Sequence, residues 1–416
     1  MLNLLSNIFF VLIKPFAINV LKKGNYPKDA IDRKCGIIPE QGFSSDDDVI
    51  MFHGVSVGEA VALENLIKTA RNEFPDSKIV MTTGTWTGQD IAKKKLGDSV
   101  DLITYFPADF PCVIEKFLDK INPKTVFIAE TEIWPFFAKE CKKRNINLYI
   151  INGRISDSTF KSYETFKYIF KYFLNFYTGI LTQSEDDNNK FLKLGANPDT
   201  TKVMNNLKFD IKKPLVDFEF DKADNKVMLA GSTHAGEDEI VLNVFKNLKQ
   251  NNKDLKLILA PRHLTRVNDI ENLVKTYGFK YDLRSNNKAD LNDIDILILN
   301  TLGELGKMYN FADFAFIGGS FNKTGGHNPL ESIVFQKPVI SGPSTHNFKD
   351  IYNIIQKAKA GFVVKTEEEF LKKATELLEN SDFYNLTVQN CINVFESQQG
   401  ALEYVINVIK TLRNNK

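Results

Sequence analysis

From residue 49 onward, the chain alternates between short apolar runs and longer stretches of helical character. The first apolar runs are VIMF (49–52), KIVMT (78–82), TVFIA (125–129), LYIIN (148–152), GILTQ (179–183) and KVM (202–204). Strands that alternate with helices predict a parallel sheet that is covered on both faces. In such a sheet, the loops that bind ligands lie at the carboxyl ends of the strands.

The alternation stops at residues 208–226, KFDIKKPLVDFEFDKADNK, which are charged and contain a proline, so we predict a linker there. It then restarts with VMLAG (227–231), LKLILA (255–260), DILILN (295–300), FAFIGG (314–319) and PVISG (338–342). The pattern therefore predicts two α/β domains of similar size, residues 24–207 and 227–416. Two such domains joined by a linker usually form a cleft.

The N-terminus departs from this pattern, because residues 2–13 read LNLLSNIFFVLI and carry no charge. The run is shorter than the ~20 residues of a spanning helix, and it lacks the basic start and cleavage site of a secretory signal. We expect residues 1–23 to form a membrane anchor that spans the bilayer or lies in its interface, with the basic residues that follow on the cytoplasmic side. The alternative is an apolar helix docked on the first domain.

Composition narrows the classes of function. With 43% hydrophobic and 25% charged residues, the chain is not disordered throughout. Its net charge of +1 lacks the basic excess of a nucleic-acid-binding protein, so we expect no nucleic-acid partner. The four cysteines lie far apart without a CxxC pair, which excludes a disulfide scaffold and a Cys-rich zinc site and fits a reducing compartment.

Two motifs in the first half carry candidate chemistry. HGVSVGE places Glu59 in the first turn of a predicted helix, where it either caps the helix or acts as a general base that faces the cleft. AETEIWP places Glu130 and Glu132 directly after a strand. Metal binding, orientation of a base, and pairing with Lys or Arg are all open roles for this carboxylate pair. The acidic run DDD at 46–48 precedes the first strand and is interpreted as a solvated loop.

Histidine is scarce, and its positions are informative as a set. All five histidines fall in predicted loops between a strand and the next helix, which predicts a polar, specialised rim on each domain. A local hydrogen bond would explain any one of them alone. They are His53, His234, His263, His327 and His346.

The second half resembles an anion and nucleotide site. APRH places Arg262 at a strand end, where a guanidinium can hold phosphate or carboxylate. NTLGEL places Gly303 and Glu304 at the next one. TGGHNPLE predicts a glycine loop and a helix from about Asn328, with Glu331 in its first turn, which would seat an anion and a ribose diol. The chain has no GxxxxGK[ST], and no GxGxxG at the first strand, which disfavours P-loop enzymes and dehydrogenases.

Taken together, these segments resemble the 3-deoxy-D-manno-octulosonic acid (Kdo) transferases of lipopolysaccharide assembly, and the hydrophobic N-terminus is similar too. The resemblance implies a GT-B fold, in which two Rossmann-like domains face a central cleft, with the acceptor in the N-terminal domain and the donor in the C-terminal one. The matching strings run in order from about residue 50 to 351: HGVSVGE, ETEIWP, NGRIS, TQSEDD, NNLKFD, GSTHAGEDE, APRH, LGELGKMY, GGSFNKTGGHNPLE and GPSTHNFKDI.

The resemblance also implies a reaction, which is the inverting transfer of Kdo from CMP-Kdo to the lipid A precursor lipid IVA. It would proceed without a metal or cofactor, at the cytoplasmic face of the inner membrane. Glu59 would be the general base, and Glu130 and Lys208 would stabilise the transition state. The implied contacts to CMP are Pro261, Arg262, Leu302, Gly303, Glu304, Asn328, Pro329, Leu330 and Glu331.

Two alternatives stay open. The chain is either another GT-B enzyme, a glycosyltransferase or epimerase for a different nucleotide sugar, or a catalytically silent nucleotide-sugar-binding protein at the membrane. Turnover of CMP-Kdo distinguishes the first, and binding without transfer identifies the second.

Overall fold

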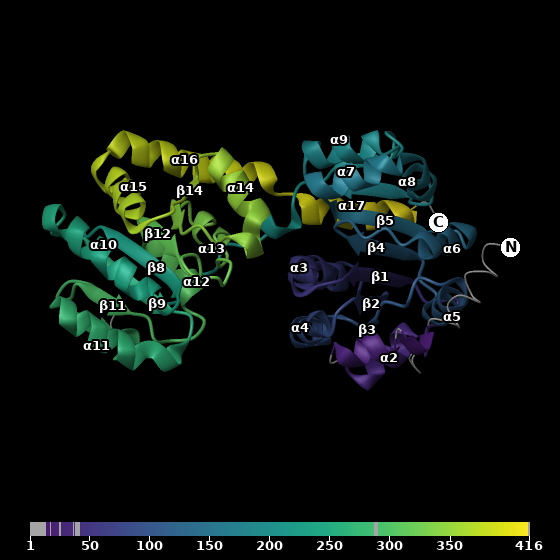
Figure 1. Ribbon diagram of the computed structural model, residues 1–416, viewed down its shortest axis with the longest axis horizontal. Helices are drawn as coiled ribbons and strands as arrows, with labels where there is room; N and C mark the ends of the chain where they lie inside the picture. Colours follow the sequence, from purple (N-terminus) through teal and green to yellow (C-terminus); the bar gives the residue numbers. More distant parts are fainter. Residues whose placement is uncertain are drawn as a thin grey trace. The chain divides into compact units, whose positions relative to one another are not determined.

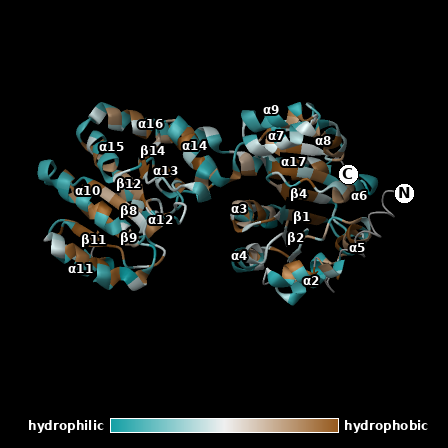
Figure 2. Cartoon of the chain, in the orientation of Figure 1, coloured by the Kyte–Doolittle hydropathy of each residue, from teal (hydrophilic) through white to brown (hydrophobic). Residues whose placement is uncertain are grey.

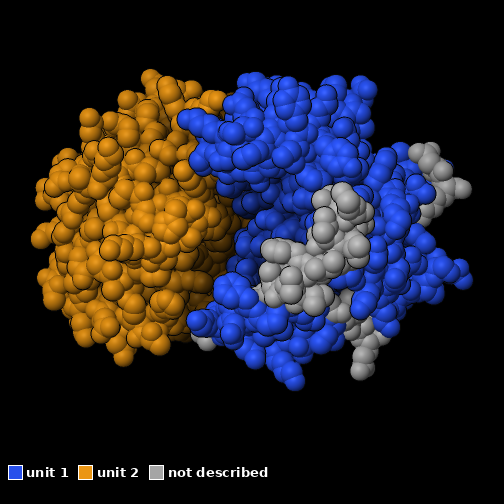
Figure 3. Space-filling model, turned by 45° about the vertical axis from the view of Figure 1, so that its right-hand side comes forward, with its two compact units in different colours: residues 1–210, 398–416 blue, residues 211–397 orange. Residues whose placement is uncertain are grey.

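The computed structural model describes residues 14–16, 18–24, 26–35, 37, 42–286 and 290–414. The chain folds into two compact units, Met1–Asp210 with Gln398–Lys416, and Ile211–Ser397 (Figures 1 and 3). Residues 1–13 of the predicted anchor lie outside the described residues. Within the described part, none of the helices combines the length and apolar character needed to cross a bilayer.

Unit 1 is built on a sheet of seven strands in the order β3-β2-β1-β4-β5-β6-β7, and its strand pairs are all parallel. The order reverses between β1 and β4, as in a Rossmann-like fold. The strands are β1 (Val49–Gly54), β2 (Lys78–Thr83), β3 (Leu102–Tyr105), β4 (Thr125–Ala129), β5 (Asn147–Gly153), β6 (Gly179–Thr182) and β7 (Thr201–Val203).

Unit 2 repeats the architecture with the strand order β10-β11-β9-β8-β12-β13-β14, again with parallel pairs. Here the order reverses between β8 and β12. The strands are β8 (Val227–Thr233), β9 (Lys256–Pro261), β10 (Tyr281–Leu283), β11 (Ile296–Ile298), β12 (Phe314–Ile317), β13 (Val339–Ser341) and β14 (Gly361–Val363).

Helices accompany the strands in both units, and most of them lie in the connections between strands. In unit 1 they are α2 (Lys28–Lys34), α3 (Val57–Glu73), α4 (Trp86–Leu96), α5 (Pro111–Ile121), α6 (Pro135–Lys143), α7 (Asp157–Thr165), α8 (Lys167–Leu174), α9 (Glu185–Lys193) and α17 (Ala401–Asn414). The second unit contains α10 (Glu237–Asn251), α11 (Val267–Tyr277), α12 (Leu305–Met308), α13 (Leu330–Ile333), α14 (Lys349–Lys357), α15 (Glu367–Glu379) and α16 (Ser381–Gln398).

The predicted parallel α/β architecture is confirmed, and each apolar run of the sequence contains a strand. Successive residues of a strand point to opposite faces, and β1 shows it: Val49 and Met51 pack in one core cluster, whereas Ile50 and Phe52 pack in another. Both faces of the sheet are therefore covered, and Figure 2 shows the hydrophobic colour concentrated in the strands. Strands β3, β10 and β14 were not predicted from the alternation, and they are only three or four residues long.

The last helix, α17, lies in unit 1, although the sequence analysis assigns residues 227–416 to the second domain. Its apolar face, which includes Val405, Ile406 and Ile409, joins the core cluster of α3. The chain leaves unit 1 after Asp210 and returns to it at Gln398. Asp210 links these two segments, because its carboxylate accepts the backbone N–H groups of Gly400 (2.8 Å) and Leu402. The start of the predicted linker up to Asp210 thus belongs to unit 1, and the rest belongs to unit 2.

Candidate functional site

In unit 1, the candidate residues gather where the strand order reverses. Strands β1 and β4 are neighbours, and their following segments leave the same carboxyl edge. Glu59 comes from the segment after β1 and Glu130 from the segment after β4. A reversal of this kind is the place where open α/β sheets bind ligands.

Glu59 lies in the first turn of α3 and is 8% exposed. Its carboxylate accepts the backbone N–H of Val55 and the hydroxyl of Ser56 (2.9 Å). These bonds within its own loop match the capping alternative, and the role of general base stays a prediction. Burial, and after it the charge of Glu130, raises the pKa of Glu59, an effect that the bonds to its loop and the charge of Lys208 only partly offset.

Glu130 and Lys208 form an ion pair next to Glu59, with 3.7 Å between Nζ and Oε1. Glu130 has a φ of 59°, a left-handed conformation that costs a non-glycine residue about 1 kcal/mol and is concentrated at functional sites. The structure therefore brings the three predicted catalytic residues together within one unit.

A buried asparagine positions Lys208. Asn152, at the end of β5, is 1% exposed and accepts the backbone N–H of Leu207 with its side-chain oxygen (3.0 Å). Asn206 accepts the N–H of Lys208 itself and donates to Gln183 (2.9 Å). No role was predicted for Asn152, Gln183 or Asn206, although the strings NGRIS, TQSEDD and NNLKFD contain all three.

Glu132 is the third carboxylate of this group. Burial, followed by the charges of Glu59 and Glu130, raises its pKa to about 7. Its backbone carbonyl accepts a hydrogen bond from the hydroxyl of Tyr177 (3.4 Å). Near neutral pH, the protonated and ionised forms of the Glu132 carboxyl are therefore both populated.

The prediction that every histidine lies in a loop is wrong for His53. It is part of β1 and fully buried, and its Nδ1 lies 3.2 Å from the carbonyl oxygen of Thr82. Its ring contacts Phe106, with 4.1 Å between centroids. Burial lowers the pKa of His53 to about 3, so the imidazole is neutral and forms part of the core.

In unit 2, three of the predicted loop histidines meet at the second reversal of strand order. His234 follows β8 and His327 follows β12, and their Nε2 atoms are 2.9 Å apart with the rings stacked. His263, after β9, lies edge-on to His234 at 5.7 Å. Burial, and then the neighbouring His234, lowers the pKa of His327 to about 4, so the hydrogen-bonded pair is neutral at pH 7.

The carboxylate of Glu237, which was not predicted as a site residue, holds the loops after β8 and β12 together. Glu237, in the first turn of α10, is fully buried and accepts four backbone N–H groups at 2.7–2.9 Å. The donors are His234, Gly319, Ser320 and Phe321. Gly318 allows the two loops to meet, because a Cβ there would lie 2.4 Å from the carbonyl oxygen of Ser232. Glu237 is part of the string GSTHAGEDE, which follows a predicted strand and could have indicated it.

Arg262 is exposed directly after β9, and Pro261 is the last residue of that strand. Burial raises the pKa of Glu331, and the charge of Arg262 lowers it in part, so the two side chains interact. The helix predicted from about Asn328 is α13, which starts two residues later at Leu330, has four residues and carries Glu331 in its first turn. The side-chain oxygen of Asn328 accepts the N–H of Leu330 (3.1 Å) and forms a turn before the helix.

The third predicted donor segment follows β11. Leu302 is 85% exposed, and Gly303 has a φ of 82°. The carboxylate of Glu304 pairs with Arg284 (3.0 Å) and accepts the hydroxyl of Thr301, and despite partial burial these bonds lower the pKa of Glu304. Glu304 thus holds a local ion pair, and its contact to a nucleotide stays a prediction.

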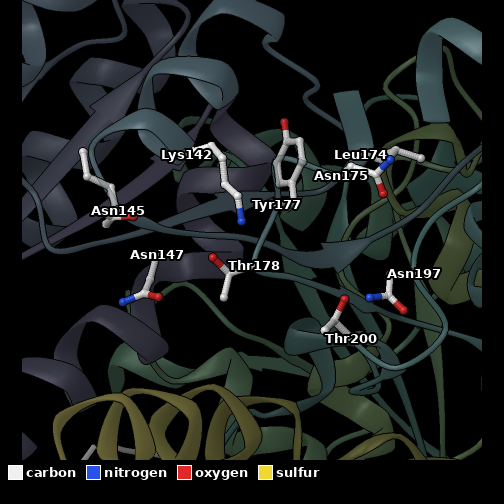
Figure 4. Close-up of a pocket in the computed structure, with 10 residues that line it drawn as sticks. Lys142, Asn145, Asn147, Leu174, Asn175, Tyr177, Thr178, Asn197 and Thr200 are labelled. Atoms are coloured by element: carbon white, nitrogen blue, oxygen red, sulfur yellow. The ribbon is translucent and has the colours of Figure 1, made fainter. Parts of the chain in front are cut away.

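The cavity shown in Figure 4, about 390 Å³ in volume, lies elsewhere in unit 1. Asn147 starts β5, and Thr178 and Thr200 immediately precede β6 and β7, so this cavity lies at the amino edge of the sheet, opposite the carboxylates. Among the described residues, no group of three or more His, Cys, Asp or Glu side chains is arranged to hold a metal ion.

Comparison with solved structures defines the class of fold. UDP-GlcNAc 2-epimerase from Neisseria meningitidis, solved with UDP-GlcNAc bound, superimposes with a TM-score of 0.55 at 12% identity, covering 88% of this chain and 100% of that one. At this identity the likeness concerns the fold alone, which is an α/β fold with two parallel sheets and a GT-B-like arrangement of strands within each unit.

Comparison of sequences identifies the family. The profile of the 3-deoxy-D-manno-octulosonic-acid transferase (kdotransferase) family matches residues 29–211. The 3-deoxy-D-manno-octulosonic acid transferase of Haemophilus influenzae is 32% identical over 369 residues, which cover 87% of this chain and 86% of the relative. The chain belongs to this family, as its motifs indicated.

A further relative is longer than this chain. The bifunctional glycosyltransferase/methyltransferase of Fusobacterium nucleatum is 36% identical over 395 residues, which are 91% of this chain. The chain spans 59% of the length of that relative.

Proposed function

We propose that this protein transfers Kdo from CMP-Kdo to the lipid A precursor lipid IVA, with inversion at the anomeric carbon. The observation that carries the proposal is the grouping of Glu59, Glu130 and Lys208 at one strand reversal, in a chain of the Kdo transferase family. The N-terminal unit would receive the acceptor, and the C-terminal unit would receive CMP-Kdo.

Glu59 acts as the general base in this proposal. Its carboxylate takes the proton of an acceptor hydroxyl while the hydroxyl oxygen bonds to the anomeric carbon of Kdo, and the bond from that carbon to the CMP phosphate oxygen breaks. A raised pKa brings a carboxylate closer to the working pH of a base. To act, one oxygen of Glu59 must exchange the hydroxyl of Ser56 for that of the acceptor.

The leaving group is CMP, whose single phosphate needs less charge compensation than a diphosphate. Arg262 offers an exposed guanidinium in unit 2, and Lys208 offers an ammonium in unit 1. Cationic side chains of this kind stabilise negative charge that develops in a transition state. The proposed reaction therefore uses these groups in place of a metal ion or cofactor.

The acceptor dictates where the protein works. Lipid IVA is an acylated disaccharide of the inner leaflet, so we propose that the protein acts at the cytoplasmic face of the inner membrane. The uncharged residues 2–13 and the basic residues after them support this location.

Mass spectrometry of the lipid product tests the proposal. Incubation of the protein with CMP-Kdo and lipid IVA should increase the lipid mass by one or more Kdo residues, whereas UDP-sugars should leave it unchanged. Transfer from a UDP-sugar would indicate a different glycosyltransferase. Binding of CMP-Kdo without any product would indicate a nucleotide-sugar-binding protein.

A further inference from the structure

The connection between β5 and β6 presents large apolar side chains to solvent. Tyr168 is 87% exposed, Phe166 58%, Tyr172 55% and Ile169 54%, and all four lie in or next to α8. Leu174 is the only buried residue of that helix. Soluble surfaces rarely expose so many neighbouring large apolar groups without a binding partner.

Contacts between aromatic rings of α7, α8 and the segment after α8 support these exposed side chains. Tyr163 of α7 stacks on Phe170 of α8 with 4.0 Å between ring centroids. Tyr172 contacts Phe176 edge-on at 5.0 Å. The exposed rings therefore project from a packed scaffold, and tyrosine, with an apolar ring and a polar hydroxyl, is enriched where hydrocarbon meets water.

The charges around these rings are mainly positive. Lys161, Lys167 and Lys171 are all exposed on α7 and α8, and Glu164 is the one acidic side chain between them. Asp157, at the start of α7, is paired with Lys190 of α9 (2.8 Å). Lysines interspersed with exposed aromatic groups are complementary to a bilayer that contains anionic lipid.

This surface adjoins the carboxylate group of unit 1. Helix α7 follows the carboxyl end of β5, and the pKa of Tyr163 is raised by burial and then by the charge of Glu132. Tyr177, three residues after α8, donates its hydroxyl to the carbonyl oxygen of Glu132. A bilayer that contacts α7 and α8 would therefore lie next to the candidate acceptor site.

We propose that this surface rests on an anionic bilayer and presents unit 1 to a lipid acceptor. We name it the α7–α8 surface, and its residues are Lys161, Phe166, Lys167, Tyr168, Ile169, Lys171 and Tyr172. Membrane binding by the α7–α8 surface does not depend on the chemistry, whereas its use in presenting an acceptor rests on the proposed function.

Vesicle co-sedimentation of the full chain tests the proposal. The variant Phe166→Ser/Tyr168→Ser/Ile169→Ser/Tyr172→Ser should bind phosphatidylglycerol-rich vesicles at least tenfold more weakly than wild type. The matched control Leu215→Ser/Leu386→Ser removes apolar groups that are also exposed (82% and 59%) but lie in unit 2, and it should bind as wild type does. Circular dichroism should show that both variants are folded.

The charge component has its own test. Lys161→Gln/Lys167→Gln/Lys171→Gln should weaken binding to phosphatidylglycerol-rich vesicles by about fivefold for each lysine, and leave binding to pure phosphatidylcholine unchanged. An equal loss on both lipids would overturn the assignment to an anionic surface.

Transfer assays separate this proposal from the proposed function. The serine variant should transfer Kdo normally to lipid IVA dispersed in detergent and poorly to lipid IVA embedded in vesicles. If wild type transfers to neither acceptor, the proposed function fails while the vesicle result still stands. Unchanged vesicle binding by the serine variant overturns the proposal, and so does a wild-type dimer that this variant abolishes, because a second copy would then cover the surface.

Discussion

At the residue scale, the carboxylates of unit 1 owe their properties to burial next to one another. Glu59 and Glu132 both have raised pKa values, with burial as the largest cause. Glu130 adds its charge to both of them and is itself paired with Lys208. Paired carboxylates with perturbed pKa values are frequent at catalytic centres, although structural networks also produce them.

Replacing the proposed base should slow the chemistry and leave binding intact. We expect Glu59→Gln to lower kcat for Kdo transfer by about a hundredfold or more, as is typical for loss of a general base. Glu64→Gln on the same helix is the control, because Glu64 pairs with the exposed Lys68 and Lys95. A kcat for Glu59→Gln within a few-fold of that control would exclude the proposed role.

The raised pKa of Glu132, about 7, predicts a pH-dependent stability. The folded protein holds this proton more tightly than the unfolded chain, whose glutamate pKa is 4.5, so the stabilisation is complete below pH 4.5 and is lost as the pH rises through about 7. Glu132→Gln removes this titration. The free energy of unfolding of Glu132→Gln, relative to that of wild type, should rise by on the order of 1 kcal/mol between about pH 5 and about pH 8, after allowance for solvent screening.

Urea unfolding of both proteins at the two pH values measures this gain. A stability difference between wild type and Glu132→Gln that stays constant with pH would contradict the prediction.

Glu237 should matter for the architecture of unit 2. A glutamine there keeps one acceptor oxygen but turns an N–H₂ group toward backbone donors, so we expect Glu237→Gln to lower the free energy of unfolding by about 3 kcal/mol. Urea denaturation measures the loss. Glu239→Gln, an exposed neighbour in α10, should change stability by less than about 0.5 kcal/mol. Equal stabilities of the two variants would show that the loops hold without the buried carboxylate.

At the scale of elements, α17 completes the core of a unit whose other residues end at Asp210. Its buried residues pack with α3 in the same cluster, and α3 also carries Glu59. The chain thus uses its last helix to support the helix on which the proposed base lies.

Truncating one side chain of α17 should therefore weaken unit 1. Ile409 is 2% exposed, and we expect Ile409→Ala to cost about 3 kcal/mol through lost burial and a residual cavity. Hydrogen exchange should become faster in α3 and stay unchanged in α10. Leu386→Ala on α16 is the exposed control. Faster exchange in α10 instead would place α17 with unit 2.

At the scale of the whole molecule, each unit has its own parallel sheet and its own apolar core. Units with separate cores can unfold separately, so a single two-state transition is not expected. A ligand stabilises the unit to which it binds.

Adding CMP should therefore protect unit 2 selectively. At a concentration of about a hundred times its Kd, a ligand stabilises its site by about 2.7 kcal/mol. Hydrogen exchange should slow in β8, β9 and β12 and remain unchanged in β1, β2 and β4. Protection confined to unit 1 would contradict the assignment of the donor site.

The sequence by itself determined the parallel α/β class, most strands and the family. A strand buried on both faces of a parallel sheet must be an uninterrupted apolar run, so TVFIA and VIMF could be recognised locally. Short strands such as β3 and β14 were missed, because three or four residues carry too little pattern.

Tertiary structure decided what depends on distant contacts. His53 and His327 are both next to glycine in the sequence, yet one lies in a strand core and the other in a loop, because burial depends on neighbours such as Phe106 and His234. The return of α17 to unit 1 and the four N–H groups gathered by Glu237 arise in the same way. Local pattern records which groups a segment can bury or bond, and only the folded chain decides which partners they meet.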